Sequence, residues 1–133
     1  MHRPLAVPPG VRVRYVDYLT REEKLRKFPE LDPRTLVTPD IIDDCFVLAR
    51  VPAASQQFVA ANHVLEHASN PLGTLRNWWR VLKPGGVLFM AVPIRDRSFD
   101  HGRALTALAH VIDDDALVRR DATSAFEARN LEH

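Results

Sequence analysis

The sequence predicts an α/β protein with a mostly parallel sheet flanked by helices. Two observations predict it: strand-like and helix-like segments alternate along the chain, and residues 87–92 form an apolar run without a polar face. Alternating segments are typical of parallel sheets, and a strand without a polar face is buried on both sides. The 133 residues suffice for one core and not for two. We therefore expect a single domain over residues 1–130, followed by a tag remnant at 131–133.

The first half of the chain is expected to hold two strands and a short helix. Residues 11–16 alternate apolar and polar side chains, which predicts a strand with one buried face. Thr20 and Glu23 form a capping box, which predicts a helix over residues 20–28. A short second strand is expected within residues 35–43.

The second half of the chain alternates in the same way. Residues 57–61 are a compact apolar run typical of a buried strand. Asn70 suits a helix N-cap and Pro71 the first helical position, and apolar residues then recur at helical spacing through residue 82. Trp78 and Trp79 are expected to pack in the core. Residues 83–86 should form a sharp turn and residues 87–92 a central strand. Two further helices are expected over residues 104–112 and 115–129.

Composition and charge exclude several classes of partner. The 18 basic and 17 acidic residues give a net charge of +1, and the basic residues are scattered, which argues against nucleic acid and anionic lipid as partners. No apolar run approaches the ~20 residues that cross a bilayer, and no secretory signal is visible. The single cysteine, Cys45, suits a reducing compartment. We therefore expect a cytoplasmic protein with neither a nucleic-acid nor a membrane partner.

One stretch resembles a known enzyme family. From residue 58 the chain reads Phe-Val-Ala-Ala-Asn-His-Val-Leu-Glu-His, then a predicted helix, Leu-Lys-Pro-Gly-Gly at 82–86 and an apolar strand. This order is similar to the middle section of the class I S-adenosylmethionine-dependent methyltransferases, in the branch often called the type 11 methyltransferase domain. The resemblance implies a Rossmann-like sheet, S-adenosylmethionine as cofactor, and methyl transfer to an unidentified small-molecule acceptor.

The resemblance also implies which residues bind the cofactor. Asp17 ends the first predicted strand, and ligands of open parallel sheets lie outside the carboxyl ends of the strands. A carboxylate there can accept hydrogen bonds from both ribose hydroxyls, although aspartate is also a common turn residue. The resemblance places Asp44 at the adenine amino group, the Cys45 amide at a ring nitrogen and Asn62 beside the sulfonium methyl. A turn or helix cap is the alternative role for Asp44.

Three residues are candidates for the chemistry of methyl transfer. Positioning supplies most of the catalysis of an in-line displacement, and a base is needed only when the acceptor must lose a proton. His63, Glu66 or His67 could be that base. A packing or surface role is the alternative for each of them.

The core predicted by the resemblance is incomplete. The five glycines (Gly10, Gly73, Gly85, Gly86 and Gly102) include no pair at the spacing of the family's glycine-rich loop, and the chain begins where that loop would end, as a truncated piece would. Without those loop amides, we expect weak or absent cofactor binding and impaired activity. Loss of the family's first strand would expose sheet edges that can pair with another chain. We therefore expect a homo-oligomer, and strand exchange between copies is one way to form it.

Two rival functions stay open at this point. His63-x-x-Glu66-His67 matches the pattern of inverted zinc peptidases, in which two histidines four apart on a helix bind zinc and the glutamate is the base. The second rival is a non-catalytic, methyltransferase-like binding module, which the absent glycine loop favours.

Overall fold

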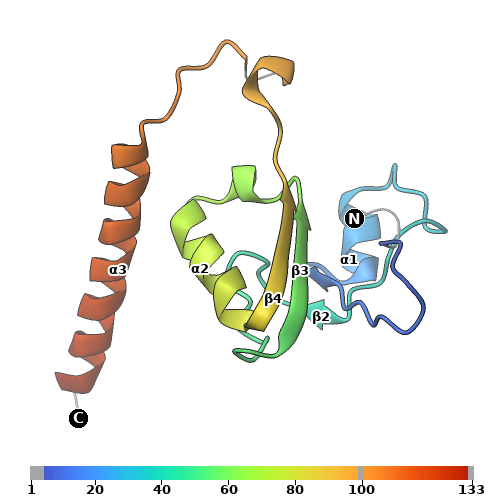
Figure 1. The fold of residues 1–133 in the computed structure, drawn as a ribbon, viewed down its shortest axis with the longest axis horizontal. Coiled ribbons are helices and arrows are strands. Elements are labelled where there is room, and N and C mark those ends of the chain that lie inside the picture. Colours follow the sequence, from blue (N-terminus) through green and yellow to red (C-terminus); the bar gives the residue numbers. More distant parts are fainter. Residues whose placement is uncertain (1–4, 99–100, 132–133) are drawn as a thin grey trace. The chain divides into compact units, whose positions relative to one another are not determined.

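The computed structural model describes residues 5–98 and 101–131. In chain order its elements are β1 (Val16–Asp17), α1 (Arg21–Lys27), β2 (Ile41–Ile42), β3 (Gln56–Asn62), the 3-10 helix η1 (Leu65–His67), α2 (Pro71–Val81), β4 (Leu82–Ala91), the 3-10 helix η2 (Arg95–Arg97) and α3 (Leu108–Leu131) (Figure 1). The contacts group these elements into two compact units, which meet in the sequence between Val51 and Pro52. Each unit is described by itself, and the single domain over residues 1–130 stays a prediction.

A short parallel sheet forms the first unit. Strand β1 pairs with β2, with Val16 opposite Ile41 and Asp17 opposite Ile42. The strand expected over residues 11–16 is therefore too long, whereas the short strand expected within residues 35–43 is present as β2. The carbonyl of Tyr15 accepts from the Asp40 and Ile41 amides. Strand pairing begins after it, at Val16.

Helix α1 begins as the sequence predicts. The Thr20 side chain accepts from the Glu23 amide while the Glu23 carboxylate accepts from the Thr20 amide, which completes the capping box. The Thr20–Glu23 bonds also lower the pKa of the Glu23 carboxyl. The predicted helix over residues 20–28 is thus confirmed, with Thr20 and Phe28 as its caps.

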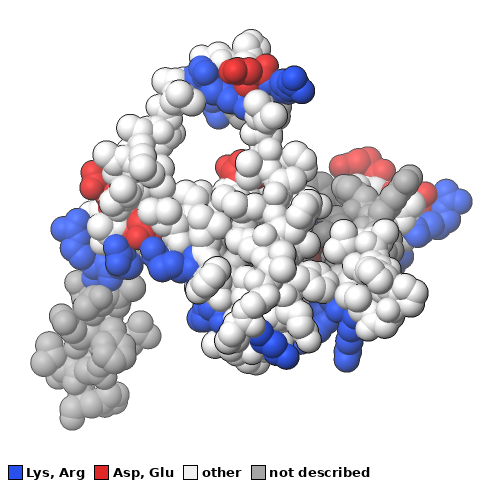
Figure 2. Space-filling model, viewed as in Figure 1, with Lys and Arg blue, Asp and Glu red and all other residues white. Residues whose placement is uncertain are grey.

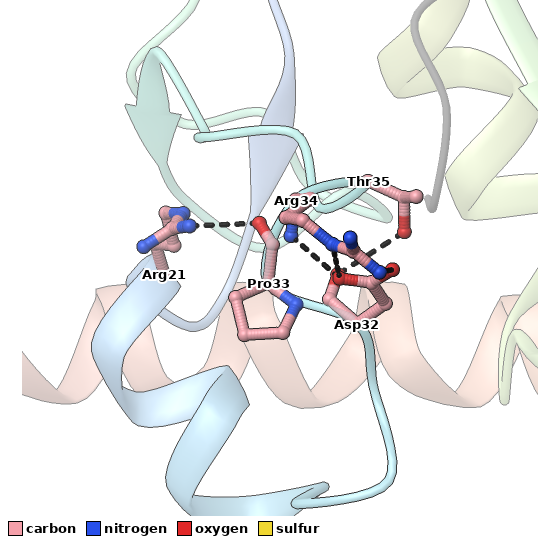
Figure 3. Close-up of polar contacts among 5 residues, drawn as sticks. All are labelled: Arg21, Asp32, Pro33, Arg34 and Thr35. Atoms are coloured by element: carbon pink, nitrogen blue, oxygen red, sulfur yellow. Dashed lines mark hydrogen bonds and ion pairs between the residues drawn. The ribbon is translucent and has the colours of Figure 1, made fainter.

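The loop between α1 and β2 is held by an exposed polar cluster. Asp32 accepts from the Arg34 amide at 2.9 Å and from the Arg34 guanidinium at 3.0 and 3.1 Å, and the Asp32 carbonyl accepts from the Thr35 hydroxyl (Figure 3). Arg21 of α1 donates to the carbonyl of Pro33. The bonds from Arg34 hold the pKa of Asp32 below its usual value. The cluster joins the loop to the start of α1.

A second parallel pair and helix α2 form the core of the second unit. Strand β3 pairs with β4 in register from Phe58 opposite Val87 to Asn62 opposite Ala91. The side chain of Asn70 accepts from the Gly73 amide at 2.8 Å and caps α2, which starts at Pro71. The helix and the β3 strand predicted from the sequence are both confirmed.

Strand β4 starts earlier than expected and contains a bulge. Gln56 lies opposite Leu82, but Phe58 lies opposite Val87, so residues 83–86 leave the ladder. Gly85 has φ +78°, a backbone conformation that side chains disfavour. A Cβ on Gly86 would lie 2.9 Å from the Lys83 carbonyl and 3.2 Å from that of Gln57. The expected sharp turn is therefore a glycine-dependent bulge inside a strand.

The strand expected to be central is not buried. Val87 and Phe89 are 60% and 58% exposed, and β4 has β3 as its one strand partner within the described residues. Leu88 and Met90 lie on the other face of β4, opposite Val59 and the buried Ala61 of β3, and Met90 is itself 44% exposed. The prediction of a strand buried on both sides is wrong because the apolar run alone does not supply a second covering layer.

The two tryptophans have opposite environments. Trp78 is 2% exposed and packs in the core with Val81, which is fully buried, whereas Trp79 is 75% exposed. Adjacent residues of a helix are about 100° apart, so both cannot face one core. The expectation of core packing is correct for Trp78 and wrong for Trp79.

One long helix replaces the two expected near the C-terminus. Helix α3 runs from Leu108 to Leu131 without a break; of the predicted tag remnant, residues 132–133 lie outside the described residues. Asp115 of α3 is 2% exposed. It contacts the Arg76 guanidinium of α2, accepts from the Asn70 side chain at 3.1 Å, and pairs with Arg119 at 3.3 Å. This network holds α3 against the beginning of α2.

The fold class predicted from the sequence is confirmed. Small parallel sheets flanked by helices make a partial Rossmann-like α/β fold. Among the helices in the described ranges, none combines the length and the apolar character needed to cross a bilayer.

Candidate functional site

Three of the predicted site residues lie together at one edge of the first sheet. Because β1 and β2 are parallel, their carboxyl ends lie at the same edge. Asp17 ends β1, and its carbonyl accepts from the Asp43 amide at 3.0 Å just after β2. Asp44 and Cys45 follow in the next turn. The first unit therefore brings together the residues expected to hold the nucleoside.

The Asp17 carboxylate is partnered and mostly buried. One oxygen contacts the Lys24 ammonium of α1 and the other accepts from the Leu19 amide at 3.1 Å. The side chains of Asp17 and Lys24 are only 18% and 12% exposed. Lys24 was not among the predicted site residues. The capping box in the sequence predicts where α1 starts, but the contact between Lys24 and Asp17 depends on how the helix folds back on β1.

The Asp44 side chain caps a turn. It is exposed, and its Oδ1 accepts from the Phe46 amide at 2.8 Å. This contact matches the turn-cap role that the sequence left open. A role in binding adenine stays a prediction.

Cys45 is half-buried in the turn after β2. Burial raises the pKa of its thiol, and the negative charges of Asp44 and Asp17 raise it further. The thiol is therefore held protonated at neutral pH and is a poor nucleophile. Any contribution of Cys45 to a site would come from its backbone, as the adenine prediction requires.

In the second unit, Asn62 and His63 stand at the carboxyl end of β3. Asn62 is exposed and is the last residue of the strand, opposite Ala91 of β4. His63 has φ +52°, in the left-handed region, and its amide donates to the Ala91 carbonyl at 2.8 Å. Residues other than glycine are uncommon in this conformation, and Leu48 at φ +53° and Ala54 at φ +49° share it. This strained histidine directly follows the strand end at which a ligand would be expected.

His63 and Glu66 lie close together, whereas His67 has a different environment. Nδ1 of His63 is 3.3 Å from Oε1 of Glu66, with side chains 66% and 23% exposed. Glu66 and His67 belong to η1, and the His67 amide donates to the Val64 carbonyl. Of the three candidate bases, the structure pairs His63 with Glu66.

The geometry does not suit the zinc-peptidase pattern. That pattern needs His63 and His67 one turn apart on a helix, but helical structure here is limited to the three residues of η1 and His63 lies outside it. Within the described part of the chain, no three His, Cys, Asp or Glu side chains cluster closely enough to hold a metal ion.

Comparison with known proteins identifies the family. A family model described as a methyltransferase domain matches residues 9–132, which is nearly the whole chain. The chain belongs to this methyltransferase family. Searches of curated proteins and of solved structures gave no match.

The family assignment agrees with the resemblance on which the site residues rest. The match is consistent with a class I domain dependent on S-adenosylmethionine, and members of the family generally bind that compound. In the first unit, the carboxyl end of β1 carries the mostly buried carboxylate of Asp17. In the second unit, considered by itself, Asn62 and His63 stand at the carboxyl end of β3. A carboxylate suits the vicinal hydroxyls of a ribose, so the residues present fit the nucleoside part of the cofactor.

Proposed function

We propose that this methyltransferase domain binds S-adenosylmethionine and transfers its methyl group to a small-molecule acceptor, with weakened binding and impaired activity because the sequence has no glycine-rich loop. The observation that carries the proposal is the largely buried Asp17 carboxylate at the carboxyl edge of a parallel strand pair. Ligands of α/β sheets bind outside this edge. The side chain of Asp17 is only 18% exposed at this edge. This placement supports a role in ligand binding more than full exposure in a turn would.

Each residue at the strand ends has a defined role in the proposal. Asp17 accepts hydrogen bonds from the ribose, and Asp44 and the Cys45 backbone contact the adenine. Asn62 lies beside the sulfonium methyl. When bound, S-adenosylmethionine supplies an activated methyl group. The chain's own part is to position the acceptor and, for some acceptors, to take a proton at His63, Glu66 or His67.

Calorimetric titration with S-adenosylmethionine tests the proposal. Replacing Asp17 by asparagine is expected to weaken binding by about 10- to 100-fold, since hydrogen bonds to charged groups contribute about 1.5–3 kcal/mol. Asp32→Asn is the matched control, because Asp32 makes the same charge change in an exposed cluster with its own Arg34 partner (Figure 3). The control is expected to bind like the original chain.

A third variant separates ligand binding from the ion pair. Lys24→Met removes the same ion pair as Asp17→Asn but keeps the carboxylate. It is expected to bind S-adenosylmethionine at least as tightly as the original chain. Equal weakening by both substitutions would contradict the ribose role of Asp17. No saturable binding by the original chain would instead favour the non-catalytic module, since the sequence has no glycine-rich loop to hold the methionine end.

We also propose that copies of the chain associate, as the exposed strand edges predicted from the sequence imply. The exposed apolar side chains of Val87 and Phe89 on β4 support this. Figure 2 shows a surface without charged side chains over the middle of β3 and β4, with Lys, Arg, Asp and Glu at its margins. Light scattering is expected to give a mass above 15.1 kDa that rises with concentration. Phe89→Lys should lower that mass, and a strict monomer at high concentration would contradict the proposal.

A further inference from the structure

The backbone at His63 fixes where its side chain leaves the sheet. The residue is in the left-handed region at φ +52°, and its amide is bound to Ala91 of β4 at 2.8 Å. This conformation is unfavourable for most L-residues. It persists because the hydrogen bond to β4 holds the chain as it turns out of β3. The imidazole therefore starts from a defined point beside Asn62.

Glu66 contacts one particular nitrogen of that imidazole. Its Oε1 lies 3.3 Å from Nδ1, and the Glu66 side chain is the more buried of the two, at 23% exposed against 66% for His63. A carboxylate beside Nδ1 favours the tautomer with hydrogen on Nδ1. The lone pair is then on Nε2, at the other edge of a ring that is mostly open to solvent.

A second histidine–carboxylate pair shows what a surface pair looks like in this chain. His110 and Asp114 lie 3.4 Å apart in an i,i+4 arrangement on α3, and the contact involves Nε2 of the ring. Both residues lie within one regular helix, where such pairs are common. The His63 pair differs because it joins a strained strand end to the following turn.

We propose that Nε2 of His63 accepts the proton of the methyl acceptor, that Glu66 is the positioning residue for it, and that the acceptor is a hydroxyl compound. This inference rests on the proposed function. The hydroxyl oxygen forms a bond to the methyl carbon as the carbon–sulfur bond breaks. The sulfonium becomes a neutral thioether, the O–H electron pair stays on the oxygen, and the proton moves to Nε2.

The need for a proton acceptor selects the hydroxyl class. A carboxylate is already ionised at neutral pH, and an amine attacks through its lone pair before it loses a proton. A thiol supplies some thiolate unaided. Alcohols and phenols hold their protons at neutral pH, so they gain most from a positioned base, typically 100- to 10,000-fold in rate.

The tautomer of His63 tests the pair without any methyl transfer. Nitrogen-15 NMR in alkaline buffer, where imidazoles are neutral, is expected to show hydrogen on Nδ1 of His63. Glu66→Ala should move it to Nε2, while Glu66→Gln, whose amide oxygen can still accept, should keep it on Nδ1. His67→Asn is the control that leaves His63 unchanged. Hydrogen on Nε2 in the original chain, or no response to Glu66→Ala, would overturn the pair.

Rates with two probe acceptors test the assignment of the acceptor class. Catechol offers a hydroxyl, and dimethyl sulfide has no proton to lose. His63→Asn suits the left-handed backbone and should lower kcat for catechol by about 100- to 10,000-fold, with a far smaller effect on the rate with dimethyl sulfide and none on KM for S-adenosylmethionine. Glu66→Ala should have a smaller effect in the same direction. Equal loss with both probes, or no methylated catechol from a chain that binds S-adenosylmethionine, would overturn the inference; failure to bind would instead contradict the proposed function.

Discussion

Replacing Trp78 by alanine is expected to lower the free energy of unfolding by about 3–5 kcal/mol. Trp78 is 2% exposed on α2 and, with Val81, is among the largest fully buried side chains of the structure. Its removal leaves a cavity that the surrounding residues fill only in part. Since a domain of this kind is stable by only about 5–15 kcal/mol, the loss is expected to appear as a large shift of the urea midpoint.

Trp79 is the matched control for this experiment. It is the next residue of the same helix and carries the same side chain, but it is 75% exposed. Trp79→Ala should change the free energy of unfolding by no more than about 0.5 kcal/mol. Because the chain has two tryptophans, each variant also leaves one reporter, and the fluorescence of Trp79→Ala should be the blue-shifted one. Equal losses from both substitutions would contradict the packing of α2.

Replacing Asp115 by asparagine is expected to release α3 from α2. The carboxylate is buried and is held by Arg76, Asn70 and Arg119. Asparagine has nearly the same shape but cannot accept from two guanidinium groups as an anion does. Amide hydrogen exchange in residues 108–121 is expected to become about tenfold faster or more. Asp114→Asn, one residue earlier and 43% exposed, is the control and should leave exchange in this segment unchanged.

The attachment of α3 should also depend on pH. The hydrogen bond from Arg76 is the main factor that lowers the pKa of Asp115, the Asn70 amide lowers it further, and burial opposes both. A carboxyl group whose pKa is lower in the folded state than in the unfolded state stabilises the folded state at pH values above the unfolded pKa, which is about 3.9. That contribution is lost as the pH falls through the folded value. Protection of residues 108–121 should therefore fall on acidification below about pH 4 in the original chain and in Asp114→Asn, but not in Asp115→Asn. A pH dependence that survived in Asp115→Asn would contradict this assignment.

The helix starts could be predicted because their signals are local. The Thr20–Glu23 capping box and the Asn70 cap each join residues three apart, so the sequence alone contains both partners. Strand length depends instead on a partner far along the chain. Residues 11–15 alternate well but belong to no strand, while Val16 pairs with Ile41.

The errors in burial and in α3 have the same origin. The apolar run at 87–92 predicts a strand but not a second covering layer. The sequence predicts two helices over residues 104–112 and 115–129, yet the structure has one, α3, in which Arg76 and Arg119 provide the opposite charge for the buried Asp115. The contact with Arg76 spans 39 residues and leaves no local mark in the sequence.

The candidate site was predicted in part. Asp17 and Asn62 end strands, as the sequence indicates. Lys24 was missed because its contact with Asp17 depends on how α1 folds back. The pairing of His63 with Glu66 rather than with His67 depends on the left-handed backbone of His63, which a sequence pattern does not encode.

The bulge in β4 offers a place to insert a reporter. Residues 83–86 leave the ladder between the Gln56–Leu82 and Phe58–Val87 pairs, and nothing lies within 4 Å of a Cβ placed on Gly85. An epitope or a fluorogenic tetracysteine peptide spliced between Pro84 and Gly85 would lengthen an excursion that already exists. It would leave untouched the cross-strand rows from Phe58 to Asn62, and with them the end of the strand that carries His63.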